Sequence, residues 1–223
     1  MKEKIQMPPK NRFTKDEMID AALDIVREKG IDALTARSLG TRMGSSTRPM
    51  FTYFSTVNEL KEAVRVRAAE RYRDVMREGL KDRIPFLGVG RRQIKFAAEE
   101  PWLYRLLFLT PYENIQSGKG TDELPGIPEL KREVVASITE IYRVDVRTAE
   151  QYYENMWLVG NSVAVQIVTG SGHFATEDIE RIFEQFSLAL FKAYRELPGF
   201  IDMTLDKDAE FRRLIGGNDN ENN

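Results

Sequence analysis

Thr47 and Arg48 are the residues of this chain whose types and position favour a definite recognition chemistry. They follow Gly44, Ser45 and Ser46 and directly precede Pro49. Proline is tolerated in the first turn of a helix, where its missing N–H would have no partner. A short helix is therefore predicted to begin at Ser46 or Thr47, with Thr47 and Arg48 at its exposed start. Threonine and arginine are residue types that read base edges in the major groove of DNA.

Two short helices joined by a tight turn are predicted around these residues, over 35–54. The hydroxyl of Thr35 is suited to cap the first helix, and Gly44 ends it because glycine turns there at little cost. The second helix, 46–54, gains an apolar side from one methionine and two phenylalanines. This is the helix-turn-helix arrangement. Any small helical hairpin shares the pattern, so a helical interaction module that does not bind DNA stays open as an alternative.

The distribution of charge agrees with a nucleic-acid-binding surface near the N-terminus. From Ala33 to Asn58 the sequence has no Asp or Glu, yet it contains Arg37, Arg42 and Arg48. Residues 1–80 hold sixteen Lys and Arg against twelve Asp and Glu, whereas residues 81–223 hold seventeen against twenty-three. Such asymmetry is typical of a small basic module attached to a body that does not bind nucleic acid.

The whole chain has the composition of a globular protein. It has 223 residues, a net charge of −2 and no cysteine, which excludes disulfides and Cys-ligated metals. No apolar run approaches the roughly 18 residues of a membrane span, and the N-terminus lacks the apolar core of a secretion signal. We therefore expect a cytoplasmic protein without a membrane partner. Its single histidine, His173, has no cysteine or second histidine as a partner, and no nucleophile elbow or dinucleotide-binding fingerprint occurs, so we expect no enzyme, metal or cofactor.

Flanking helices complete the predicted N-terminal region. Residues 1–12 are a polar arm that we expect to be flexible. A capping box at Thr14 and Glu17 opens a helix that Gly30 ends, and a second capping box is predicted at Thr56 and Glu59. The helix-turn-helix domain is predicted over 13–56, followed by a connecting helix over 57–80.

Residues 13–62 resemble the N-terminal domain of the TetR/AcrR family of bacterial transcriptional regulators. The shared features are the first helix ending in EKG, then LT, then MGSSTRPMFTYF, and a Thr-capped fourth helix that contains NELKEAV. The sequence departs from the family pattern at Phe51, Tyr53 and Val57, where Tyr, His and Lys are common. The resemblance implies a homodimeric repressor of double-stranded operator DNA that a small-molecule effector releases. The residues predicted to contact DNA are Thr35, Arg37, Ser46, Thr47, Arg48, Met50, Phe51, Tyr53 and Lys61.

The remainder of the chain, 81–215, is predicted to be an all-helical domain for effector binding and dimerisation. Residues 84–90 contain one proline and two glycines and are predicted to form a connector or a short helix, before a helix over 93–100. Pro101 breaks that helix, and an apolar run follows over 102–109. Further helices are predicted over 127–144, 148–169 and 176–197, and the tail 216–223 is disordered by composition.

Aromatic side chains are the most distinctive feature of this second domain. Ligand pockets are apolar and aromatic with a few polar groups, although each single ring has the hydrophobic core as its alternative. The residues predicted for an effector pocket are Phe96, Trp102, Phe108, Tyr112, Tyr152, Asn155, Met156, Ser162 and Gln166. A DNA-binding regulator without a small-molecule effector is the alternative.

Two apolar stripes run along the last two long helices. The resemblance implies that these helices form a four-helix interface with their copies in a homodimer, through Gly160, Ala164, Ile167, Ile179, Phe183, Phe186 and Leu190. The alternative is that both stripes serve only the core of the monomer.

Overall fold

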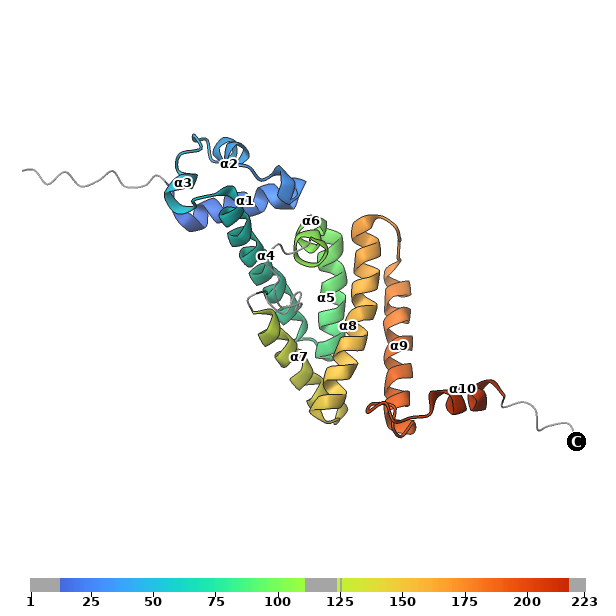
Figure 1. Cartoon of the computed structure of the whole chain (residues 1–223). Helices are drawn as coiled ribbons and strands as arrows, with labels where there is room; N and C mark the ends of the chain where they lie inside the picture. Colours follow the sequence, from blue (N-terminus) through green and yellow to red (C-terminus); the bar gives the residue numbers. More distant parts are fainter. Residues whose placement is uncertain (1–12, 111–123, 125, 217–223) are drawn as a thin grey trace, which may run out of the picture.

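The computed structural model describes residues 13–110, 124 and 126–216. Within these ranges the chain forms helices and no strand, which confirms the predicted all-α class (Figure 1). The predicted arm 1–12, Tyr112 and residues 217–223 lie outside them. The elements are α1 (Lys15–Lys29), η1 (Ile31–Ala33), α2 (Ala36–Arg42), α3 (Met50–Tyr53), α4 (Val57–Gly79), α5 (Pro85–Glu99), α6 (Pro101–Tyr104), η2 (Arg105–Leu109), α7 (Ile127–Tyr142), α8 (Val146–Thr169), α9 (Thr176–Glu196) and α10 (Lys207–Ile215).

Helix α1 begins and ends at the residues that the sequence predicts. Thr14 and Glu17 form the capping box, with each side chain accepting a hydrogen bond from the backbone N–H of the other. Gly30 ends the helix at φ +81°, a conformation that side-chain-bearing residues rarely adopt. The inner face of α1 packs on α2 and α4 through Met18, Ala22 and Val26, which are fully buried.

The turn between α2 and α3 has its glycine as predicted, but α3 is shorter than the predicted helix 46–54. Gly44 adopts φ +58° after α2, and regular α3 geometry begins only at Met50. The residue before a proline is disfavoured in helical geometry, so Pro49 keeps Arg48 out of the helix proper. Pro49 itself is already helical, at φ −56°, and stands as the N-cap of α3 in place of a serine or threonine.

The cap of α4 also differs from the prediction. Thr56 accepts the backbone N–H of Glu59 at 3.1 Å, as expected. The Glu59 carboxylate, however, accepts the N–H of Ser55 at 2.7 Å and not that of Thr56. The reciprocal capping box at Thr56 is therefore wrong, and the carboxylate instead holds the chain one residue before the cap.

A single helix, α5, replaces the predicted connector at 84–90 and the separate helix at 93–100. Pro85 occupies its first turn, where proline fits. Gly88 lies inside the helix because α4 crosses there: a Cβ on Gly88 would stand 2.2 Å from the carbonyl oxygen of Gly79. The glycines that read as loop residues in the sequence are thus contact residues between two helices.

The apolar run that follows Pro101 divides into α6 and a π-helical turn, η2. The N–H of Thr110 bonds the carbonyl of Arg105 at 2.9 Å, the wider hydrogen bond of a π-turn. The guanidinium of Arg105 donates to the carbonyl of Val168 at 2.7 Å, which ties this turn to the end of α8.

The long helices form layers below the N-terminal module. Figure 1 shows α4 and α7 on one side, α5 and α8 in the middle and α9 on the other side, with α1, α2 and α3 at the top. Asp145 caps α8 by accepting the Thr148 N–H at 3.0 Å, and Gly170 ends it at φ +73°. Helix α10, for which the sequence analysis makes no prediction, extends from the lower end of α9 away from α7.

Candidate nucleic-acid interface and ligand cavity

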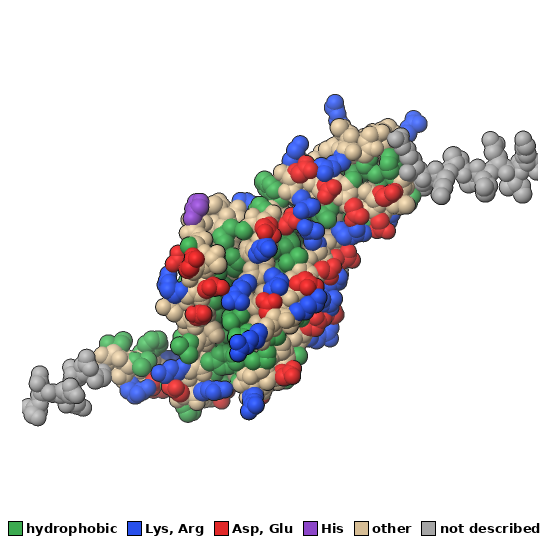
Figure 2. Space-filling view, turned by 180° about the vertical axis from the view of Figure 1, so that it is seen from behind, with side chains coloured by type: hydrophobic (Ala, Val, Ile, Leu, Met, Phe, Trp, Pro, Cys, Tyr) green, Lys and Arg blue, Asp and Glu red, His purple; other side chains and the backbone are tan. Residues whose placement is uncertain are grey.

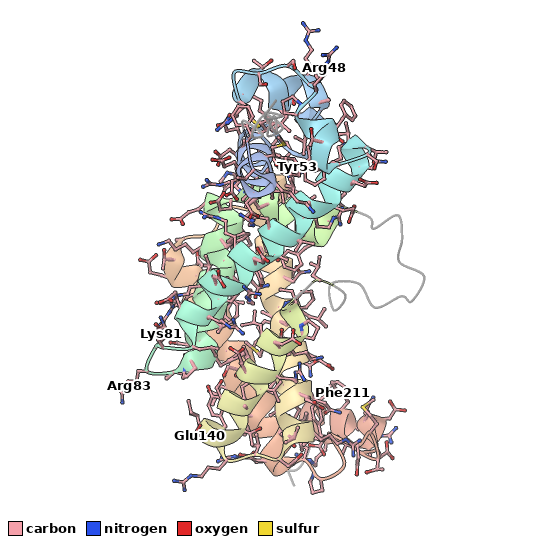
Figure 3. All side chains as sticks on the ribbon, turned by 90° about the vertical axis from the view of Figure 1, so that its left-hand side faces the viewer. Arg48, Tyr53, Lys81, Arg83, Glu140 and Phe211 are labelled. Atoms are coloured by element: carbon pink, nitrogen blue, oxygen red, sulfur yellow. The ribbon has the colours of Figure 1, made fainter. Side chains whose placement is uncertain are left out.

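The turn before α3 and the start of α2 form the outermost tip of the molecule. Ser46, Thr47 and Arg48 are exposed, as are Thr35 and Arg37 at the start of α2. Figure 3 shows Arg48 extending from this tip away from the body of the protein. The tip therefore presents hydroxyl and guanidinium groups from two neighbouring helix starts, which are the donors that contact bases and phosphates.

Positive charge at this tip is not neutralised within the described part of the chain. Arg37, Arg48 and Lys61 make no ion pair with any residue that the structure describes. Arg42 differs, because it pairs with Glu28 at 2.7 Å and Asp24 at 3.3 Å. From behind, blue side chains project from the tip, whereas blue and red are mixed over the helices below (Figure 2).

Residues 50–53 divide between the outer surface and the core. Met50 is only 2% exposed and packs in the hydrophobic core, so we remove it from the predicted DNA contacts. Phe51 is 54% exposed on the outer side of α3. Tyr53 is half-buried, and its hydroxyl donates to the carbonyl of Phe13 at 3.0 Å, so it connects α3 to the chain two residues before α1.

Gly40 supports the tip, and sequence reasoning missed it. The turn crosses α2 there: the Ser45 N–H donates to the Gly40 carbonyl at 2.8 Å. A Cβ on Gly40 would stand 3.0 Å from the carbonyl oxygen of Ser45 and 3.1 Å from that of Ser46. A glycine in the middle of a predicted helix is the signal that could have revealed this close approach.

A carboxylate joins the N-terminal module to the helices below it. Glu100, at the end of α5, accepts hydrogen bonds from Arg27 of α1 at 2.6 and 2.8 Å and from Arg71 of α4 at 2.7 Å. Burial alone would raise the pKa of Glu100, but the two guanidinium groups together hold it below its usual value. Beside this cluster, Trp102 of α6 packs on Gly30, where a Cβ would come within 2.8 Å of the ring.

A cavity of about 500 Å³ lies among α4, α5, α7, α8 and α9. This volume is within the range of small-molecule sites. Its walls are mostly apolar and aromatic, with the residues Tyr72, Met76, Phe86, Val89, Gly90, Gln93, Phe108, Ile127, Leu130, Lys131, Val134, Tyr153, Glu154, Met156, Trp157, Leu158 and Phe183.

Aromatic contacts stiffen one wall of this cavity. The ring of Tyr72 meets Phe96 and Phe108 edge-on at 5.2 and 5.1 Å between centroids, and Phe108 lies 6.4 Å from Trp157. Burial raises the pKa of the Tyr72 hydroxyl well above its usual value, so it stays neutral at physiological pH. Polar groups are few: Gln93 is 4% exposed, and Lys131 pairs with Glu154 at 2.9 Å.

The structure brings two of the residues predicted for the pocket, Phe108 and Met156, to this cavity. Phe96 supports Tyr72 from behind, and Trp102 packs on Gly30. The other predicted pocket residues that the structure describes lie elsewhere. Tyr152 is fully buried and shares a 2.7 Å hydrogen bond with Ser187, and Asn155 donates to the hydroxyl of Tyr194. Ser162 and Gln166 lie on the outer side of α8. The sequence shows aromatic richness, but which rings face the cavity depends on how the helices are rotated.

The residues predicted for a dimer interface divide in the same way. Gly160, Ala164 and Phe183 are buried inside the subunit, and the Phe183 ring packs on Gly160 and Gly90. Ile167, Ile179 and Leu190 are partly buried against this core. Phe186 is 52% exposed and forms an apolar stripe along α9 with Ile182, Ala189 and Ala193. We call this stripe, together with the exposed Leu158 of α8, the outer α8–α9 face.

No helix among the described residues is long and apolar enough to cross a membrane. No group of acidic and histidine side chains in the same part of the chain could hold a metal ion.

An N-terminal helix-turn-helix module with a basic tip, on a helical body that encloses a cavity, defines the class of this fold. No protein-family model matches the sequence, and no curated protein matches it significantly. Among solved structures, a TetR-family member from Streptomyces coelicolor A3 is similar, with 19% identity and a TM-score of 0.52 over 78% of this chain and 95% of that chain. The chain therefore has the TetR fold.

A second solved structure is similar over a comparable length. It is the TetR-family repressor AlkX of a Dietzia strain, described as implicated in the biodegradation of n-alkanes, and it is 14% identical. The match covers 84% of this chain and 97% of that chain, with a TM-score of 0.38.

Proposed function

We propose that this protein is a homodimeric transcriptional repressor that binds a palindromic DNA operator and leaves it when a small apolar or amphipathic effector enters the cavity. The observation that carries the proposal is the exposed tip, where Arg37 and Arg48 stand without ion pairs to any described residue at the end of a helix-turn-helix module. The TetR fold supports the same assignment. Two copies would place their α3 helices in successive major grooves, about 34–36 Å apart.

Within this proposal the tip residues have separate roles. Thr47 and Arg48 contact base edges from the turn before α3, while Thr35, Arg37 and Lys61 contact phosphates. Ser46 and Phe51 flank the base-reading residues on the exposed surface. The hydroxyl of Tyr53 donates to the carbonyl of Phe13, so we assign it the role of holding α3 in place instead of a phosphate contact.

The cavity favours a regulator with an effector over one without. A filled interior would support control by a protein partner or by abundance, and a 500 Å³ apolar cavity fits a small molecule instead. An effector that binds more tightly to a dimer whose tips are wrongly spaced for the DNA grooves lowers operator affinity. The loss equals the difference between the effector's binding free energies for that dimer and for the DNA-binding dimer. The Glu100 cluster lies between the cavity-bearing helices and the module that carries the tip.

Selection of bound sequences from random DNA tests the proposal directly. The wild-type protein should enrich a palindrome with two half-sites, and Arg48→Ala should lose about 1–3 kcal/mol of binding free energy for that palindrome. Lys95→Ala, which removes an exposed cation on α5 remote from the tip, is the matched control and should keep the same half-sites. Enrichment of no sequence, with no retention of duplex DNA, would support the helical interaction module.

A further inference from the structure

Gln93 is the polar side chain on the face of α5 that lines the cavity. Phe86, Val89 and Gly90 line the cavity from the same helix, and Gln93 follows them at the spacing of one helix face. The side chain is buried, with 4% of its surface exposed. Burying an amide costs free energy unless it is hydrogen-bonded. The partners of this amide therefore decide whether it serves the core or a ligand.

The amide nitrogen of Gln93 makes no hydrogen bond within the part of the chain that the structure describes, although it is covered from solvent. The hydroxyl of Tyr104 is a polar neighbour: burial raises the pKa of Tyr104 to about 12, and the Gln93 amide opposes that rise. That hydroxyl donates its own proton to Asn161 at 2.7 Å. Because an amide nitrogen has two hydrogens, even a hydrogen bond to Tyr104 would leave one N–H without an acceptor.

Gly160 of α8 lies opposite the amide and leaves room for it. A Cβ on Gly160 would stand 3.1 Å from Oε1 of Gln93 and 3.2 Å from Cζ of Phe183. All three residues lie at the crossing of α5, α8 and α9, and Gln93 and Phe183 line the cavity there. The last torsion of a glutamine side chain is broad. Either end of the amide can therefore turn toward a molecule in the cavity.

The charged residues of the cavity wall lie where the wall reaches solvent. Lys131 and Glu154 pair at 2.9 Å, and their side chains are 28% and 58% exposed. The other residues of the wall are apolar or neutral, and burial keeps the hydroxyl of Tyr72 protonated by raising its pKa. A carboxylate placed beside Gln93 would thus lose its hydration without meeting a cation among the described residues of the wall. A neutral acceptor carries a much smaller cost at this place.

We propose that the effector of this cavity carries a neutral carbonyl oxygen, as in a ketone, ester or amide, which accepts a hydrogen bond from Nε2 of Gln93. The inference rests on the proposed function and names the chemical class of its effector. A carbonyl meets this donor without adding a hydrogen that needs an acceptor of its own. The remainder of the effector is apolar, to match the aromatic and aliphatic wall. A hydrocarbon of the same shape leaves the N–H unpaired, so the site discriminates against it.

Benzophenone and diphenylmethane are matched probes, because a carbonyl joins the two phenyl rings in one and a methylene joins them in the other. Gln93→Met keeps the length of the side chain and removes both of its polar atoms. By titration calorimetry on the full chain, the ratio of the benzophenone to the diphenylmethane association constant should fall about tenfold in this variant. Met156→Leu also changes the cavity wall but removes no donor, so it is the matched control and should keep the wild-type ratio.

The carbonyl stretching frequency of bound benzophenone gives a second measurement, which needs no variant. In the wild-type complex it should lie below its value in cyclohexane, because an accepted hydrogen bond weakens the C=O bond. An unshifted frequency, or the same ratio of association constants in wild type and Gln93→Met, would refute the role of Gln93 and leave the proposed effector cavity standing. Failure of both probes to bind a wild-type protein that binds its operator would overturn the effector cavity and this inference together.

Discussion

Replacing Glu100 with glutamine removes one negative charge at the junction of α1, α4 and α5 while keeping the size of the side chain. The wild-type carboxylate is 10% exposed and accepts hydrogen bonds from Arg27 and Arg71. Loss of one partner from a fully buried ion pair costs about 3–5 kcal/mol, and an exposed pair contributes about 0–1 kcal/mol. The two arginines are 37% and 43% exposed and are rehydrated in the variant. We therefore expect the free energy of unfolding to fall by about 2 kcal/mol.

Thermal and chemical denaturation at pH 7 measure this loss. For a chain of this size about 2 kcal/mol corresponds to a fall in melting temperature of roughly 4–8 °C. Glu99→Gln is the matched control. Glu99 is 64% exposed and forms a long, 3.7 Å ion pair with Lys95, so its replacement should change the free energy of unfolding by less than about 0.5 kcal/mol. Equal effects of the two variants would refute the reasoning.

The pH dependence of the difference gives an independent check. Folding lowers the pKa of Glu100 below its usual value of 4.5. The folded state therefore binds this proton less readily than the unfolded state, so the stabilisation is complete above the usual pKa and is lost as the pH falls through the folded pKa. The gap between wild type and Glu100→Gln should be full at pH 7 and should shrink below about pH 4.5. A gap that stays constant with pH would contradict the role of the charge.

Three further comparisons test other parts of the structure. Gly88→Ala should lower the free energy of unfolding by about 3 kcal/mol, because its Cβ meets the backbone of α4, whereas Gly44→Ala has open space and should lose about 1 kcal/mol through its positive φ alone; urea denaturation compares them. Asp145→Ala should destabilise α8, and the deficit should shrink as the pH falls below the usual aspartate value of 3.8, because the Thr148 hydrogen bonds lower the pKa of Asp145 in the folded state; melting curves at pH 7 and pH 3 test this. Val134→Phe should narrow the cavity and weaken binding of anilinonaphthalene sulfonate, measured by fluorescence, with unchanged circular dichroism.

Local sequence signals predicted the helix ends well because they act over three or four residues. The Thr14–Glu17 box, the Thr35 cap and the stop at Gly30 need only their neighbours, and the structure has all three. The connector predicted at 84–90 is wrong. Gly88 is a glycine because the backbone of Gly79, on a different helix, leaves no room for a side chain there. Sequence periodicity does not record where two helices cross.

The direction in which a side chain points was harder to predict than the helix that carries it. Met50 and Phe51 are neighbours on one apolar helix, yet one is buried and the other exposed. Phe183 reads as part of an outer stripe, but the two glycines opposite it leave room for its ring inside the subunit. Trp102 is predicted to line the effector pocket, but its ring packs on Gly30. In each case the deciding neighbour is distant in the chain.

The salt dependence of operator binding tests the central claim most directly. For the wild-type dimer, the logarithm of the association constant should fall steeply and linearly with the logarithm of salt concentration, as phosphate contacts release counterions. Arg37→Ala, which removes one guanidinium from the tip of each subunit, should reduce the slope by about two per dimer, since each phosphate that is no longer neutralised lowers it by about one. Lys95→Ala, on α5, should leave it unchanged. A flat salt series for the wild type, or equal slopes for wild type and Arg37→Ala, would contradict the assignment of this tip to DNA.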